Sequence, residues 1–351
     1  MRSTVYPNPF RDNAMNQFGL FDYNKRLSRI DKAGDPLVEL NQVVDWEQFR
    51  QLIELAREKP RKSPAGAKGY DCILLFKILI LQSLYNLSDE GIEYQILDRY
   101  SFSRFLNISE GSKVPDATTI FRFRDELAQA NVVELLFTQF DQFLRDHGFR
   151  AQKGQIVDAS IVRVPIQRNS REENEQIKAG KSIASWSEAK RRQKDTDARW
   201  TKKNGKAFFG YKNHLSIDVA HKFIRSYEVT DASIHDSQVF TELLDPENTS
   251  KDVYADSAYR SEDSLQTLAD QDFREHIQRK GCRHKKLSAR EQRGNRSRAR
   301  VRSRIEHVFG VMAMRTGSTV IRAIGFIRIR AKIGLRNMAY NLTRYALLAG
   351  T

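Results

Sequence analysis

The chain has 351 residues, of which 40% are hydrophobic, so it can bury a sizeable core and is not globally disordered. Its formal charge of +15 and pI near 9.7 favour a polyanionic partner, with nucleic acid as the first candidate. Its two cysteines, Cys72 and Cys282, have no metal-type spacing, which indicates a reducing cytosol.

The N-terminal third of the chain favours helices. Residues 1–44 show no strong hydrophobic period, and we expect an extended or partly ordered arm there. Residues 45–147 carry apolar residues at helical spacing. The longest apolar run, residues 72–81, contains Lys77 and is too short to span a bilayer, so we expect a buried helix and no membrane span. The separate helices are predicted over residues 71–87, from Ser88, from Pro115 and over residues 132–147.

Arginines on one of these short helices suggest a DNA-reading role. Arg122 and Arg124 lie on the helix that follows Pro115, and such an arrangement fits a helix-turn-helix reader. An ordinary helical bundle is equally compatible with the pattern. We predict a helical DNA-binding and assembly domain over residues 1–150.

The second part of the chain, residues 151–351, begins with strand signals. Residues 155–164 are β-branched and alternating, and three strands followed by helix, strand, helix, strand and helix predict a mixed α/β domain. A charged stretch at residues 167–206 is predicted to be a long loop or flexible insert, in which Trp186 and Trp200 either stack on unpaired bases or anchor the loop. The later strands are expected at 208–219, 223–230, 251–256 and 273–278, with helices at 238–244, at 261–271 and from residue 296.

Two aspartates stand near the ends of predicted strands. Asp158 follows Ile156 and Val157, and Asp256 follows the apolar run that begins at Val253. Carboxylates that converge on one point would hold hard divalent cations, and two such ions about 3.5–4 Å apart support phosphodiester chemistry. The alternative is that each aspartate caps a turn, which is the favoured interpretation for a lone strand-end aspartate.

A third acid, Glu306, lies in a dense run of cations. Residues 283–304 contain eight arginines and two lysines against one acid, Glu291. Such a segment would repel itself unless phosphates neutralise it. Arg302 shares a helical face with Glu306, which also fits a routine Arg–Glu pair. The arginines expected to line DNA are Arg296, Arg298, Arg300, Arg302 and Arg304.

Other polar residues are weaker candidates. Lys212 and His214 share a face of a predicted strand and could approach DNA, although a plain surface strand is the preferred interpretation. His235 and Asp236 are expected to cap the following helix rather than act in catalysis. His307 either supports the metal ligands or lies at an interface.

These segments occur in the order found in bacterial insertion-sequence transposases with a DDE triad, and the chain most resembles the insertion-sequence-five family. They are IVDAS at 156–160, GYKNHLSID at 210–218, HD at 235–236, YADSAY at 254–259 and RIEH at 304–307, with YNLSDE at 85–90 and PDATTIFRFR at 115–124 in the helical part. The related Tyr-x2-Arg-x3-Glu-x6-Lys signature matches at Arg302 and Glu306, but its Tyr and Lys positions are Ala299 and Ala313, with Arg315 as a possible substitute for the lysine.

The resemblance implies a ribonuclease-H-like catalytic domain with Asp158, Asp256 and Glu306 as its acids. These would bind Mg²⁺, or Mn²⁺ as a substitute, as two ions. The implied activity is cleavage at terminal inverted repeats of double-stranded DNA and joining of the 3′-hydroxyls to target DNA. A homodimer or larger assembly would hold both ends, in the bacterial cytoplasm and on the nucleoid.

Three rivals stay open. A domesticated, catalytically idle DNA-binding regulator is disfavoured by the three intact acids. A basic RNA-binding or structural protein would explain the charge but not the ordered acids. A nuclease of the same fold that cuts without joining differs only in strand transfer.

Overall fold

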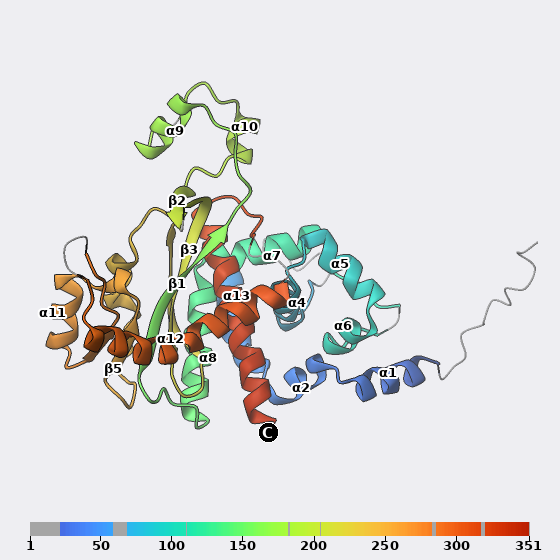
Figure 1. Ribbon diagram of the computed structural model, residues 1–351. Helices are drawn as coiled ribbons and strands as arrows, with labels where there is room; N and C mark the ends of the chain where they lie inside the picture. The colour runs from blue at the N-terminus through green and yellow to red at the C-terminus, as the bar shows by residue number, and fades with distance from the viewer. Residues whose placement is uncertain are drawn as a thin grey trace, which may run out of the picture.

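A mixed six-stranded sheet lies at the centre of the computed structural model, which describes residues 22–58, 69–109, 111–181, 183–203, 205–282, 286–316 and 320–350 (Figure 1). The strand order is β2-β3-β1-β5-β6, and β4 pairs with β3 alongside β2. β1 runs antiparallel to β3 and parallel to β5, and β5 runs parallel to β6. The predicted mixed α/β fold is confirmed. The strands are β1 (Gln155–Arg163), β2 (Arg199–Lys203), β3 (Lys206–Asp218), β4 (Ile224–Asp231), β5 (Asp252–Ala255) and β6 (Arg274–Ile277).

The turn between β3 and β4 illustrates how polar residues shape this sheet. The Asp218 carboxylate accepts hydrogen bonds from the backbone N–H groups of His221 at 2.6 Å and Phe223 at 3.1 Å. Arg225 pairs with the same carboxylate at 3.2 Å and with Asp141 of the helical region at 2.8 Å. Asp218 is therefore a structural residue that is buried and fully satisfied.

Short capped helices form the N-terminal part. Asp71 accepts from the N–H groups of Ile73 and Leu74, and Ser88 and Asp116 cap the next helices in the same way. Residues 1–44 were expected to be an extended or partly ordered arm. The extended form is wrong for residues 22–43, which form two helices, while residues 1–21 lie outside the described residues. The helices are α1 (Asp22–Ala33), α2 (Pro36–Val43), α3 (Arg50–Arg57), α4 (Cys72–Tyr85), α5 (Asp89–Asp98), α6 (Tyr100–Phe105), α7 (Ala117–Gln129) and α8 (Val132–Asp146).

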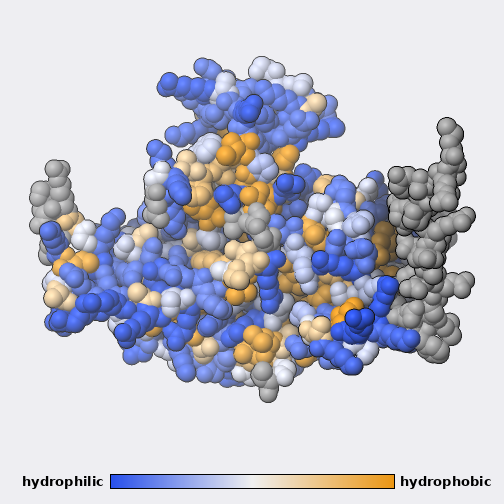
Figure 2. Space-filling view, turned by 45° about the vertical axis from the view of Figure 1, so that its right-hand side comes forward, coloured by the Kyte–Doolittle hydropathy of each residue, from blue (hydrophilic) through white to orange (hydrophobic). Residues whose placement is uncertain are grey.

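The charged insert at residues 167–206 is a folded protrusion rather than the predicted loop. It contains α9 (Arg171–Lys178), α10 (Glu188–Gln193) and strand β2. Neither helix has a buried residue, so no hydrophobic period marks them. Polar contacts organise them instead, since Trp186 Nε1 and Lys190 Nζ both donate to Glu173 Oε1 at 2.6 Å. α9 and α10 stand away from the sheet with a hydrophilic surface, whereas β2 pairs with β3 within it (Figures 1 and 2).

The chain closes with two long helices. α12 (Ala289–Thr316) begins earlier than the predicted residue 296, and α13 (Phe326–Ala349) follows it. α11 (Glu262–Asp270) matches its prediction, whereas the helix expected at 238–244 is two short 3₁₀ turns, η2 (Asp236–Val239) and η3 (Thr241–Leu243). A run this short carries too few residues to distinguish the two kinds of helix by period.

One hydrophobic core joins the two predicted domains. Phe76 and Leu144 of the helical region, Ile156 and Leu215 of the sheet, and Leu335 of α13 belong to the same buried cluster. α13 packs against α4, α7, α8 and β4, and Figure 1 shows it between the helices and the sheet. The residues before and after position 150 therefore pack against each other in one core.

Within the described ranges, no single helix is long and apolar enough to cross a membrane. α4 and α5 reach the length and apolar composition of a membrane span only when they are taken together, and they meet at 101°. α4 lies in the protein core, where ten of its side chains are buried.

Candidate active site

Asp158 and Asp256 lie side by side on neighbouring parallel strands. Val157 is paired with Ala255 in the last matched position of β1 and β5. Asp158 is the next residue of β1, and Asp256 directly follows β5. Asp158 is not at a strand end as predicted, because β1 continues along β3 to Arg163. It stands where the pairing with β5 ends. Asp256 also caps the 3₁₀ turn η4 (Ser257–Tyr259), accepting from the Ala258 N–H at 2.8 Å.

An arginine from α12 neutralises Asp158. Arg302 Nη2 lies 2.7 Å from Asp158 Oδ2, and Arg302 Nη1 donates to Gln278 Oε1 at 2.8 Å. The two charged side chains are only 11% and 13% exposed. Burial raises the pKa of Asp158 above its ordinary value, the Arg302 guanidinium opposes that shift, and the Asp256 carboxylate adds to it. The alternative of an Arg302–Glu306 pair is therefore not what the structure shows, because Arg302 binds Asp158.

Glu306 lies one helical turn beyond Arg302 and is exposed, as is His307 beside it. Their neighbours Ile305 and Val308 are buried where α12 packs on β1 and β5. In the part of the chain that the structure describes, no three acidic, histidine or cysteine side chains are grouped closely enough to hold a metal ion. The structure therefore brings Asp158 and Asp256 together but leaves Glu306 apart from them.

Tyr259 and Asp236 lie near the two aspartates, and neither was predicted as a site residue. The Tyr259 side chain is fully buried, and its hydroxyl has no hydrogen-bond partner among the described residues. Burial raises the pKa of Tyr259 well above its ordinary value, and the carboxylates of Asp158, Asp236 and Asp256 raise it further. An unsatisfied hydroxyl surrounded by acids marks a polar centre that is incomplete without a ligand or water. Tyr259 belongs to the YADSAY segment, which was the signal that could have identified it.

Lys212 and His214 are internal residues of the sheet. Lys212 Nζ donates to the Ile234 carbonyl at 2.6 Å and pairs with Asp236 at 2.7 Å. His214 is fully buried against Thr230, and burial lowers its pKa to about 4, so the ring is neutral near pH 7. The preferred interpretation of a surface strand is wrong, because β3 is paired on both edges and buried along most of its length. His214 is therefore closed off from the surface, whereas Lys212 is half-buried and bound to Asp236.

The two arginines of α7 point in different directions. Arg124 is buried, donates to Asp89 Oδ2 at 2.9 Å and to Gln82 Oε1 at 2.8 Å, and joins α7 to α4 and α5. Its donors are used inside the bundle rather than presented to base edges. Arg122 is exposed.

The predicted DNA-facing arginines of α12 divide in the same way. Arg296 and Arg300 are exposed, and Arg304 is half-buried. Arg298 is half-buried with Nη1 3.4 Å from Asn295 Oδ1, and Arg302 faces the sheet. His235 caps η2 through its Nδ1, 3.4 Å from the Ser237 N–H, whereas Asp236 binds Lys212 instead of capping.

A family model described as "Transposase DDE domain" matches residues 150–342, and one described as "Transposase domain (DUF772)" matches residues 25–126. Among solved structures, the chain is similar to a piggyBac transposase determined by cryo-EM as a synaptic complex with hairpin DNA. The identity is 10% and the TM-score 0.45, over 90% of this chain and 75% of that chain.

Proposed function

Since the chain belongs to the family of transposases with a DDE domain, we propose that it cleaves the terminal inverted repeats of an insertion sequence and joins the freed 3′-hydroxyls to target DNA. Asp158, Asp256 and Glu306 are the acids expected to carry out this chemistry. Both reactions are in-line displacements at phosphorus and require no covalent link between protein and DNA. We also propose that the chain is a member of the insertion-sequence-five family and that it acts on DNA of the bacterial nucleoid.

The observation that carries the proposal is the pair of aspartates beside the last matched position of β1 and β5. A carboxylate pair with a guanidinium on one member is a place where positive charge is stabilised, and carboxylate oxygens suit Mg²⁺ and Mn²⁺. The partnerless Tyr259 hydroxyl beside the pair also fits a site that is completed by a ligand. Asp158 and Asp256, with Glu306 from α12, would hold two ions. When bound, these would activate the attacking oxygen and stabilise the leaving one.

The protein side chains have separate roles in this scheme. Arg302 compensates the charge of buried Asp158 and fixes α12 against the sheet. Glu306, one turn away on the same helix, would reach the acids through a shift of α12. Arg296, Arg300 and Arg122 are exposed and are the proposed contacts to DNA phosphates. A homodimer or larger assembly is proposed because both element ends must be held together.

The deciding experiment is cleavage of a labelled DNA duplex that carries the terminal repeats. Wild-type protein should cut it with Mg²⁺ or Mn²⁺, bind it with little turnover in Ca²⁺, and stop cutting in excess EDTA. Asp158→Asn, Asp256→Asn and Glu306→Gln should each lower the rate at least about a thousandfold, because several kcal/mol of metal-assisted stabilisation are lost. Glu262→Gln, an exposed acid on α11, is the matched control and should cut at the wild-type rate.

The same assay separates the rivals. Cleavage that persists in EDTA would exclude the metal mechanism. Repeat-specific binding without cleavage by the wild type would instead favour an idle regulator, for which the exposed Glu306 outside the acid pair is the supporting observation. Cleavage without joined products would favour the third rival, a nuclease of the same fold that cuts DNA without strand transfer.

A further inference from the structure

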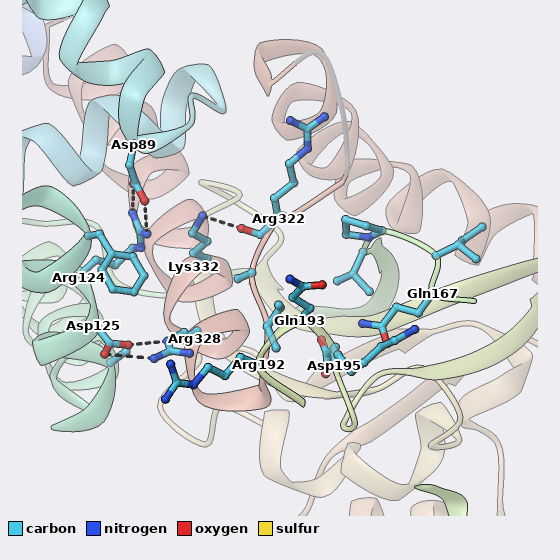
Figure 3. A pocket seen from close by; sticks show the side chains of 18 of the residues that line it. Asp89, Arg124, Asp125, Gln167, Arg192, Gln193, Asp195, Arg322, Arg328 and Lys332 are labelled. Carbon is cyan, nitrogen blue, oxygen red and sulfur yellow. Dashed lines mark hydrogen bonds and ion pairs between the residues drawn. The ribbon is translucent and has the colours of Figure 1, made fainter. Parts of the chain in front are cut away.

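Two adjoining cavities lie beside α13. The larger lies between α7, α13 and the segment that follows β1, and the smaller lies between the end of α4, the start of α5 and α13. One has a volume of about 660 Å³ and the other about 600 Å³. The walls of the larger cavity come from α7, from the residues after β1, from the end of α10 and from α13 (Figure 3). The two cavities adjoin, because four residues border both of them: Asp89, Arg124, Arg322 and Lys332.

Positive charge dominates the lining. Eight basic side chains face four acidic ones across the two cavities. α13 contributes Arg328, Lys332 and Arg336 at intervals of one helical turn, which is about 5.4 Å. Arg328 is neutralised by Asp125 at 2.6 Å. Lys332 and Arg336 have no carboxylate partner within the described residues. Lys332 donates to the Arg322 carbonyl at 3.2 Å, and Arg336 donates to Asn86 Oδ1 at 3.0 Å.

This charge is held at a cost to the fold. Burial lowers the pKa of Lys332 to about 8, and the nearby cations Arg124 and Arg336 contribute to the shift. Burial likewise lowers the pKa of Arg336 to about 10. Like charges four residues apart on a helix destabilise it. A bound anion would relieve both the burial of charge and the repulsion.

The larger cavity also has an apolar wall. The Phe121 side chain is 40% exposed, and the guanidinium carbons of Arg124 and Arg328 both lie 5.8 Å from its ring centroid. An aromatic ring beside cations is a surface on which nucleic-acid bases stack. The remaining apolar lining residues are Ala128, Val164, Pro165, Ile166, Ala323 and Ile324.

We propose that this space binds one unpaired nucleotide of a DNA strand, with its phosphate at Lys332 and Arg336 and its base against Phe121. The proposal rests on the proposed function for the source of the strand. A single nucleotide suits two adjoining cavities of this size better than a duplex, which needs an open groove. Val164 directly follows β1 and lies six residues beyond Asp158, roughly 20 Å at the rise of a strand. A strand that reaches the acids could therefore also reach this space.

The first test measures binding of a short, fluorescein-labelled single-stranded oligonucleotide to full-length protein in EDTA, where no cleavage contributes. Lys332→Gln and Arg336→Gln should each weaken binding about tenfold, because each removes a charge-assisted hydrogen bond to phosphate. Lys153→Asn removes an equal charge at the opposite end of β1 and should bind like the wild type. Thermal melts of Lys332→Gln without DNA should match or exceed the wild type, which shows that any loss is not unfolding.

The second test concerns the base. Phe121→Ala should weaken binding of the normal oligonucleotide about tenfold and leave an otherwise identical abasic oligonucleotide unaffected. Wild-type-like binding by Lys332→Gln and Arg336→Gln overturns the proposal. So does equal loss for a duplex of the same length, which indicates a general basic surface. Inorganic phosphate that competes as well as the oligonucleotide would also overturn it. Failure of cleavage by wild-type protein, with these binding results intact, would reject the proposed function alone.

Discussion

The acid pair on β1 and β5 and the cationic cavity beside α13 both hold buried charge of one sign, but they compensate it differently. At the acids, Arg302 supplies a full counter-charge to Asp158. In the cavity, Lys332 and Arg336 are met by a carbonyl and an amide oxygen instead. The first site should therefore be sensitive to loss of its counter-ion, whereas the second should tolerate loss of its charges as long as no ligand is bound.

The largest expected effect on stability comes from removing Arg302, which is the counter-ion of Asp158. Arg302→Gln leaves buried Asp158 next to Asp256, and should lower the free energy of unfolding by about 3 kcal/mol without metal. Mg²⁺ or Mn²⁺ should recover more stability in this variant than in the wild type. Chemical denaturation with and without metal measures both quantities. Arg300→Gln, exposed on the same helix, is the control. Equal stability of the two variants would show that the Arg302–Asp158 pair is not needed.

The outward arginines of α12 form a third group, for which DNA is the expected counter-ion. Arg296→Gln with Arg300→Gln should leave stability unchanged and weaken duplex binding about tenfold at moderate salt. The slope of log affinity against log salt should fall by about 0.9 for each lost phosphate contact. Titrations at several salt concentrations measure it. An unchanged slope would mean that these side chains are only solvated.

Asp256→Asn should show the smallest effect, with the opposite sign. The amide keeps the cap on η4 and removes the repulsion felt by Asp158, so stability without metal should rise by about 1 kcal/mol. Asp252→Asn at the other end of β5 is the matched control, and should destabilise because Asp252 binds Arg274 and His276. Destabilisation by both changes would show that Asp256 acts only as a cap.

Local signals were sufficient for most elements of the fold. β-branched alternation located β1, and the helix starts predicted at residue 71, Ser88 and Pro115 lie within one residue of the observed caps Asp71, Ser88 and Asp116. α9 and α10 were missed because they have no buried stripe and depend on contacts such as that between Trp186 and Glu173.

The candidate site was predictable only where neighbouring strands define it. Asp158 and Asp256 follow strand signals, and parallel pairing brings them together. The partner of Asp158 is 144 residues away in sequence, and no local pattern reports such a contact. The same holds for Arg124. It was predicted to contact DNA, but it forms a buried ion pair with Asp89 on another helix. The roles of Glu306 and of the outward arginines stay predictions.

The packing of α13 has a consequence for synthesis of the protein. Leu335, Met338 and Leu342 fill the same core as α4 and α8, yet a ribosome produces them well after those two helices. Until that helix emerges, the nascent helical region presents an uncovered apolar face and depends on chaperones or on delayed collapse. A reading frame interrupted before Phe326 would thus yield aggregating or degraded chains rather than a folded fragment that competes for DNA.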